Sequence, residues 1–212
     1  MRAKAIILAA LLPLAAAAQE SAPPMPENPR APRFDEVERG FFTGFEVGYL
    51  TLFKTPVADP TKFAYVKDPI TGAPRAGGRS DGFMVGTTVG YDVTDRLALA
   101  IYGLGASSAA GPWYGSFSMF SFGGDARVAL LGARDANRVE RFYLYLHGRA
   151  GYLVSFPSGL FTTHDLYVAG GPGIEYFTHL RHFSIGLAAD VAYVMNAKAA
   201  GLAVTPTVRY TF

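Results

Sequence analysis

The segment from Phe142 to Phe156 alternates between apolar and polar side chains along its whole length of about fifteen residues. Because a β-strand turns successive side chains to opposite faces, this alternation predicts one long strand with an apolar and a polar face. A mean globular strand has about five or six residues, whereas a tilted strand needs about nine to eleven to cross a bilayer. The segment is therefore long enough to span a membrane. Its apolar face carries Phe142, Leu144, Leu146, Ala150, Tyr152, Val154 and Phe156, and its polar face carries Tyr143, Tyr145, His147, Arg149, Gly151 and Ser155.

The same alternation recurs after Gly40. It predicts strands over residues 41–53, 82–91, 97–107, 116–131, 141–156, 165–177, 183–195 and 201–212. Polar connections at 92–95, 132–140 and 178–182 alternate with longer ones, of which 54–81 is the longest. An even number of strands, with short turns at one end and the longest loop at the other, is typical of outer-membrane barrels. We therefore predict an all-β fold, an eight-stranded antiparallel transmembrane β-barrel over residues 40–212. Pro172 and Pro206 fall within strands, and because proline has no N–H to donate we expect a bulge or local break at each.

The composition of the two faces indicates which of them is outside. The apolar face carries no charged residue, whereas the polar face is mostly Gly, Ala, Ser and Thr with a few charges, and no lysine lies in any predicted strand. Small residues suit the narrow interior of an eight-stranded barrel. An Arg or Lys that faces lipid at mid-bilayer costs roughly 2–4 kcal/mol. The apolar face is therefore predicted to face lipid.

Aromatic residues gather at the ends of the predicted strands. Those near the short turns are Phe41, Tyr91, Phe142, Tyr176, Phe183 and Tyr210, and those toward the opposite end are Tyr49, Phe83, Phe117, Phe156 and Tyr193. Aromatic rings are enriched at both membrane–water interfaces, so these two groups are expected to form belts on the outer surface.

The N-terminal residues differ in composition from the rest of the chain. Residues 1–18 combine a positive start, an apolar run and small residues at the end, which is the pattern of an export signal peptide. Residues 19–39 contain five prolines and mixed charges, and are predicted to form an extended tail on the periplasmic side. The chain has no cysteine, which excludes disulfides and thiolate metal sites. A net charge of +2 gives no electrostatic basis for binding nucleic acid.

A small group of charged residues falls on the polar face and is predicted to lie in the lumen. The acids are Glu46, Asp125, Glu175 and Asp190, and the bases are Arg127, Arg149 and Arg209 with His147 beside them. A charge in a narrow lumen must be paired, and an arginine can hold a carboxylate through two parallel contacts. We expect a salt-bridged plug that blocks conduction. A gated pore or a proton relay would use the same groups, and the residues alone leave these alternatives open.

Membrane-embedded enzymes need a nucleophile or an activated water beside a base. In the predicted lumen, His147 with Ser155 or Ser121 is the only such set. The other candidates are the neighbours His164 and Asp165 at the loop end and the pair His179 and His182 in a short turn. Neighbours in a strand point to opposite faces, and no carboxylate or cysteine joins the two turn histidines. We therefore predict a protein that is not an enzyme, without catalytic residues, metal or cofactor.

The long predicted loop 54–81 carries a modest excess of positive charge. Its basic residues are Lys54, Lys62, Lys67, Arg75 and Arg79. Because long loops on a rigid scaffold often carry binding function, these residues are candidates for binding anionic lipopolysaccharide or another surface polymer. A solvated loop without a ligand is the alternative.

The strand pattern, the export signal, the short turn GYDVTDRL at 90–97 and the C-terminal TVRYTF at 207–212 resemble the small outer-membrane barrels of the OmpA, OmpX and OmpW type. In those proteins a C-terminal aromatic, here Phe212 with Tyr210 nearby, belongs to the signal that the barrel-assembly machinery reads in the last strand. The Pro-rich lead-in and the opening GFFTGFEVGYL at 40–50 are also similar to the barrel component of the myxobacterial adventurous gliding machinery.

These resemblances imply a protein of the bacterial outer membrane. We expect a non-enzymatic membrane anchor or scaffold of an envelope-spanning assembly, for which the second resemblance suggests the gliding motility machinery. Expected partners are outer-membrane lipids, the barrel-assembly machinery during insertion, and periplasmic or outer-membrane proteins. The alternatives are a passive channel for small apolar solutes of the OmpW kind, in which Pro172 would mark a lateral opening, and a lipid-modifying enzyme.

Overall fold

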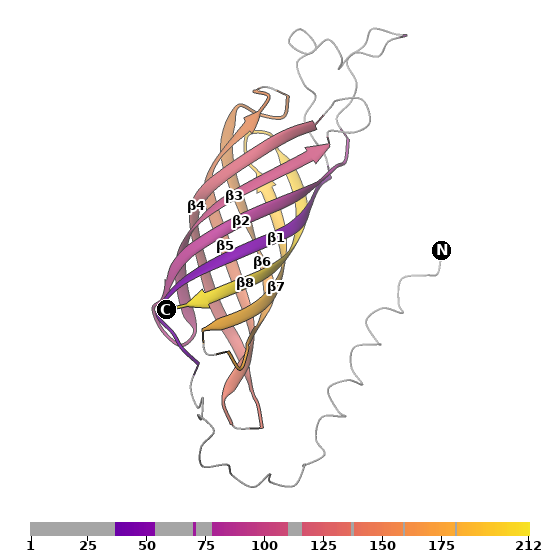
Figure 1. Ribbon diagram of the computed structural model, residues 1–212. Helices are drawn as coiled ribbons and strands as arrows, with labels where there is room; N and C mark the ends of the chain where they lie inside the picture. Colours follow the sequence, from indigo (N-terminus) through magenta and orange to yellow (C-terminus); the bar gives the residue numbers. More distant parts are fainter. Residues whose placement is uncertain are drawn as a thin grey trace, which may run out of the picture. The chain divides into compact units, whose positions relative to one another are not determined.

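The computed structural model describes residues 37–53, 70, 78–109, 116–136, 138–158, 160–180 and 182–212. They form β1 (Phe41–Leu52), β2 (Ser80–Asp92), β3 (Leu97–Ala109), β4 (Ser116–Arg134), β5 (Glu140–Phe156), β6 (His164–Phe177), β7 (Phe183–Val194) and β8 (Ala199–Thr211). Each strand pairs antiparallel with its neighbours in sequence, and β1 also pairs with β8, so the sheet closes into a barrel (Figure 1). The predicted eight-stranded antiparallel barrel is confirmed.

Two predicted segments are not part of this description. The export signal at 1–18 and the tail up to residue 36 lie outside the described residues. Among the residues that are described, no helix is long and apolar enough to cross a membrane.

The alternation seen in the sequence is an alternation between the exterior of the barrel and its lumen. In β5, Leu146 exposes 46% of its surface on the outside, whereas Arg149 exposes 6% inside. The same division holds in the other strands, so the prediction that the apolar face is the outer face is confirmed. Closure also leaves the sheet without an edge through the barrel wall, which hydrocarbon requires because unpaired backbone groups there cost several kcal/mol each.

Aromatic rings pair on the outer surface at both ends of the barrel. Phe41 and Tyr91 lie 5.0 Å apart between ring centroids near the short turns, and Tyr49 and Phe83 lie 6.4 Å apart toward the opposite end. The prediction for Phe117 is wrong, because this side chain is 1% exposed and points into the lumen. The reason is its parity in β4: it lies an odd number of residues from the outward-facing Phe120, so the pleat turns it inward.

The two prolines interrupt the ladder without shifting its register. Pairing between β6 and β7 runs to Gly170 and resumes at Gly173, so Pro172 and its neighbour have no partner on that side. Pairing between β1 and β8 skips Pro206 in the same way. The predicted local breaks are therefore present at both prolines. Bulges occur instead between β4 and β5, at 129/131 and at 133/134.

Candidate functional site: the lumen

The lumen holds an apolar layer at the end where the longest loop lies. Buried side chains from the strands, including Leu50, Leu52, Met84 and Leu153, form this layer. The β5–β6 loop closes over it, with Leu160 and Phe161 3% and 6% exposed. The ring of Phe161 stacks on that of Phe117, with 4.8 Å between centroids and 11° between planes. This end of the lumen is therefore filled by hydrophobic side chains.

Asp165 ties the neighbouring loop to the same layer. Its carboxylate is 2% exposed and accepts hydrogen bonds from the backbone N–H groups of Asn196 and Ala197, each at 2.8 Å. Because these donors lie in the β7–β8 turn, the bonds hold that turn against the start of β6.

A chain of charged residues crosses the middle of the lumen. The guanidinium of Arg149 on β5 donates to both oxygens of Glu46 on β1, at 2.6 and 3.1 Å, and its Nε donates to Asp125 on β4 at 3.1 Å. His147 lies 3.4 Å from Asp125 through Nδ1 and 2.6 Å from Asp190 on β7 through Nε2. Since β1 and β5 lie on opposite sides of the closed sheet, Arg149 bridges the full width of the barrel.

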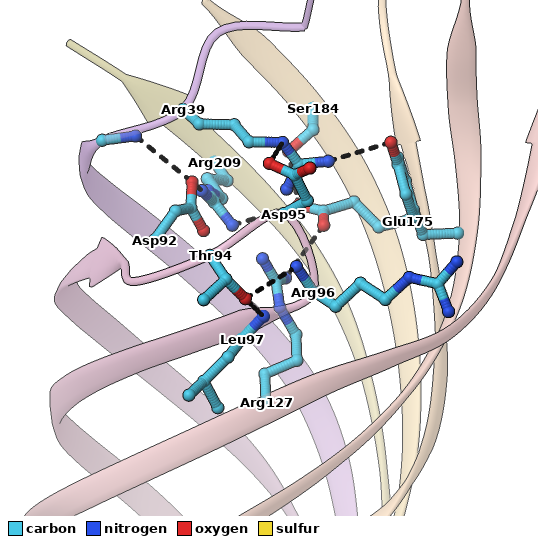
Figure 2. A network of polar contacts seen from close by, with 12 residues as sticks. Arg39, Asp92, Thr94, Asp95, Arg96, Leu97, Arg127, Glu175, Ser184 and Arg209 are labelled. Atoms are coloured by element: carbon cyan, nitrogen blue, oxygen red, sulfur yellow. Dashed lines mark hydrogen bonds and ion pairs between the residues drawn. The ribbon is translucent and has the colours of Figure 1, made fainter.

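A second cluster lies toward the short turns and links β2, β4, β6, β7 and β8 (Figure 2). Glu175 is its centre: Arg127 approaches one carboxylate oxygen at 3.0 Å and Arg209 the other at 3.8 Å, while the Ser184 hydroxyl donates to it at 2.7 Å. Arg209 also pairs with Asp92. The cluster thus ties these strands together across the interior.

The residues just before β1 cover the short-turn mouth of the lumen. Arg39 donates to the hydroxyl of Tyr143 at 2.9 Å and lies 3.9 Å from Asp95, as Figure 2 shows for the second contact. Glu38 lies 2.5 Å from His182 in the β6–β7 turn. The last residues of the predicted tail therefore belong structurally to the barrel.

All eight predicted lumen residues lie in these two clusters, and each is within ion-pair distance of a partner. The space left among them is small. A cavity of about 70 Å³ lies beside the two clusters, and one of about 20 Å³ lies under the mouth. Since a water molecule needs about 10–15 Å³ of such space, the first cavity has room for several waters and the second for about one. Chemically, the arrangement neutralises charge and cross-links the wall.

The lumen residues considered for catalysis are not brought together. His147 is held by two aspartates. The hydroxyl of Ser121 lies 3.0 Å from that of Tyr102, and the hydroxyl of Ser155 pairs with the backbone of Thr162 in the β5–β6 loop. Both serines are therefore engaged elsewhere.

Outside the lumen, His164 does not meet Asp165, whereas His182 has a carboxylate beside it: Glu38 lies 2.5 Å from its Nδ1, so the expectation that no carboxylate joins the turn histidines is wrong for His182. His164 is exposed and stacks on Tyr152, whereas its neighbour Asp165 is buried, as the pleat requires. His182 lies against Glu38 and the carbonyl of Thr211. Within the part of the chain that the structure describes, no group of three or more His, Cys, Asp or Glu is placed to hold a metal.

The remaining predicted residues lie at the two ends of the barrel. Of the basic loop residues, Lys54, Lys62, Lys67 and Arg75 lie outside the described residues. Arg79 is described, is exposed, and pairs with Asp81 at 2.9 Å. The C-terminal Phe212 is 71% exposed, contacts Tyr210 with 5.0 Å between ring centroids, and donates its backbone N–H to Phe41.

Sequence reasoning missed three charged residues of the lumen and its mouth. Asp92 continues the inward alternation of β2 by one further step, so extending the predicted strand past residue 91 would have found it. Arg141, 4% exposed and 2.8 Å from Asp135, already lies within the predicted strand 141–156 and shares the inward parity of Tyr143, so the alternation itself would have found it. No pattern in the sequence indicated Arg39, because it precedes the first strand.

Comparison with known proteins gives matches in structure alone. No protein-family model matches the chain, and no curated protein sequence matches it. Neisserial surface protein A aligns with a TM-score of 0.58 at 14% identity, over 81% of this chain and 97% of that one. The outer membrane protein OprG of Pseudomonas aeruginosa aligns at 0.45 and 12% identity, over 84% and 96%. Ail, the attachment invasion locus protein of Yersinia pestis, aligns at 0.42 and 14%, over 82% and 100%.

Of these alignments, the one with Neisserial surface protein A has a TM-score above 0.5 and therefore shows a shared fold. At 14% identity, this alignment shows similarity of fold alone and says nothing about a ligand or a partner. The matches give no support to the resemblance to a gliding-machinery component. With its closed sheet, apolar exterior and charged interior, the chain has the fold of the small eight-stranded outer-membrane barrels.

Proposed function

We propose that the protein is a non-enzymatic barrel of the bacterial outer membrane whose lumen is a structural plug, and that it acts as a membrane anchor or scaffold. The observation that carries this proposal is the bridge of Arg149 to Glu46 across the width of the lumen. With both charges 6% exposed or less, the contact spans the part of the lumen that an ion would have to pass. Below it, the cluster around Glu175 crosses the lumen a second time.

The outer surface supports the membrane location. Large apolar side chains cover the outside of every strand, with exposures such as 69% for Ile101, 61% for Phe122 and 63% for Val191. Soluble proteins rarely expose contiguous apolar patches larger than a few hundred Å², whereas an apolar band flanked by aromatic residues is the outer surface of a membrane barrel.

Planar-bilayer recording tests the plug. The purified full chain is expected to insert without a stable open conductance, because both charged clusters fill the lumen. A matched variant, Arg149→Ala with Glu46→Ala, removes the bridge between these two residues and should raise the frequency of brief openings. A steady, ion-selective current from the unaltered chain would contradict the plug and favour a pore.

The scaffold role needs a surface for partners, and the Pro-rich tail is one candidate. Because Glu38 and Arg39 contact the barrel, a truncation that tests the tail should remove residues 19–36 and retain these two. The shortened chain is expected to insert normally and to lose proteins that co-purify with the full chain from the native membrane. Unchanged partners would exclude the tail as the docking segment. The gliding motility machinery is the assembly we propose first, on the resemblance of the Pro-rich lead-in and residues 40–50 alone.

A passive route for small apolar solutes is the second candidate function. The interruption between β6 and β7 at Pro172 favours it, since a gap in the ladder is where a solute would leave the wall sideways. Replacing Pro172 by Val supplies the missing N–H and should close such an exit. Uptake of an apolar solute into liposomes that falls with Pro172→Val, and not with the same change at Pro206, would support this function over the scaffold.

A further inference from the structure

The β4–β5 hairpin carries an open strand edge. Pairing between β3 and β4 ends at Leu97 and Val128, and the last backbone contact runs from Ala129 N–H to the carbonyl of Arg96 at 2.7 Å. Strand β4 continues to Arg134, where it pairs with β5 alone among the described residues. Figure 1 shows this hairpin extending past the other short turns. In a strand, every second residue turns its N–H and C=O to a given side, so alternate residues of 130–134 have backbone groups without a partner strand among the described residues.

This edge is apolar as well as open. Leu130 and Leu131 are 43% and 65% exposed, because the bulge at this point turns both side chains to the surface. Proteins usually blunt such edges with charged residues, prolines or bulges. Residues 130–134 contain no lysine or proline, and their one charge, Arg134, is paired with Glu140, although two bulges bend this part of the hairpin. The neighbouring β2–β3 turn, with Asp95 93% exposed in its side chain, indicates that the hairpin leaves the bilayer here and meets water.

Positive charge stands at both ends of the edge. Arg96 lies at its base and Arg138 at the hairpin tip; both are exposed, and neither has an ion-pair partner in the part of the chain that the structure describes. In Figure 2 the guanidinium of Arg96 points away from the network around Glu175. Arg134, between them, is held by Glu140 at 3.4 Å.

We propose that residues 130–134 are a docking site for an extended segment of a periplasmic partner protein, which adds to β4 as a further strand and places acidic residues opposite Arg96 and Arg138. Main-chain hydrogen bonds provide the affinity in such strand addition, and alternate side chains provide the specificity. The proposal rests on the outer-membrane scaffold role, with this end of the barrel in the periplasm, and it specifies the partner's chemistry.

The other occupants fit this edge less well. The chain's own tail, residues 19–36, holds five prolines, each of which lacks the N–H that a ladder needs. A second copy paired through the same edge would bring the unpaired arginines of both copies together. An acidic strand of another protein can form hydrogen bonds with the open backbone groups and ion pairs with Arg96 and Arg138.

The test uses the full chain in lipid nanodiscs and a synthetic peptide of alternating valine and threonine with an aspartate at each end. The peptide is expected to slow amide hydrogen exchange of residues 130–134 and to bind with a measurable Kd by fluorescence anisotropy. Leu131→Lys should abolish both effects, because a charge blocks the edge. The matched control is Leu180→Lys, an exposed leucine (68%) in another short turn, which should leave binding unchanged. Arg96→Gln or Arg138→Gln should each weaken binding by about fivefold at most.

Several results would overturn the proposal. Equal loss of binding in Leu131→Lys and Leu180→Lys, or no protection of 130–134 at saturating peptide, would exclude the edge. Protection of these amides in the absence of peptide would also overturn the proposal. If that protection vanishes when residues 19–36 are removed, the tail occupies the edge. If it vanishes on dilution, a second copy of the chain occupies the edge. Insertion is measured separately, by protection of the strands from protease. A chain that fails to insert refutes the membrane role itself, whereas one that inserts without binding refutes only the docking site.

Discussion

Replacing Arg149 by methionine tests whether the lumen clusters stabilise the barrel. Methionine keeps much of the length and the apolar stem of arginine, so the change removes the charge with little loss of packing. Arg149 is 6% exposed and makes three charge-assisted contacts, two to Glu46 and one to Asp125. Asp125 retains His147 at 3.4 Å. Glu46, 4% exposed, has no other ion-pair partner among the described residues, so its carboxylate is left buried and unpaired.

The expected loss follows from that isolated carboxylate. Removing one partner of a buried ion pair costs about 3–5 kcal/mol, because the remaining charge stays desolvated without compensation. Adding Glu46→Gln to Arg149→Met neutralises that charge and should recover about 2 kcal/mol, so the double variant is expected to be more stable than the single one. Arg134→Met is the control, since its pair with Glu140 is exposed (68% for Arg134) and contributes about 0–1 kcal/mol.

Equilibrium unfolding by urea in lipid vesicles, followed by the β-sheet circular dichroism signal, measures these differences in the free energy of unfolding. The free energy of unfolding is expected to be nearly unchanged in Arg134→Met, lower in the double variant, and lowest in Arg149→Met. Equal stabilities for Arg149→Met and Arg134→Met would show that the bridge does not stabilise the wall. A double variant less stable than Arg149→Met would refute the reasoning from an unpaired charge.

Three further predictions concern the apolar layer, the outer surface and the fit of the glycines. Phe161→Ala removes a buried ring from the loop end and should lower the free energy of unfolding by about 3 kcal/mol in the same urea assay. Leu146→Arg places a charge in lipid and should cost about 2–4 kcal/mol in vesicles, with a smaller loss in detergent. Gly123→Ala should destabilise the barrel, since its Cβ would overlap the carbonyl of Ala150, whereas Gly124→Ala faces open space and should be neutral or stabilising by about 0.5–1 kcal/mol, as thermal unfolding will show.

Much of this fold follows from local pattern. The alternation in β5 and its repeats predicted strand number, strand order and the outer face, because a pleated strand separates its side chains by parity and lipid tolerates no charge. The same rule identified the charged residues of the lumen. Its errors lie near strand ends. The belt prediction for Phe117 goes against the parity of that residue, Arg141 has inward parity but is not among the predicted lumen residues, and Asp92 lies one residue beyond the predicted end of its strand.

The alternation of side chains along a strand does not predict which charged residues of the lumen pair with one another. Glu46 and Arg149 are 103 residues apart and lie on strands that never pair, so only the curvature and stagger of the closed sheet bring them face to face. The same holds for Phe161, which reaches the lumen from a loop, and for Arg39, which crosses the mouth from outside the strands. The open edge at 130–134 also depends on where β3 begins relative to the end of β4. Period and polarity are properties of neighbouring residues, whereas these contacts depend on the register of distant strands, which is set when the barrel closes.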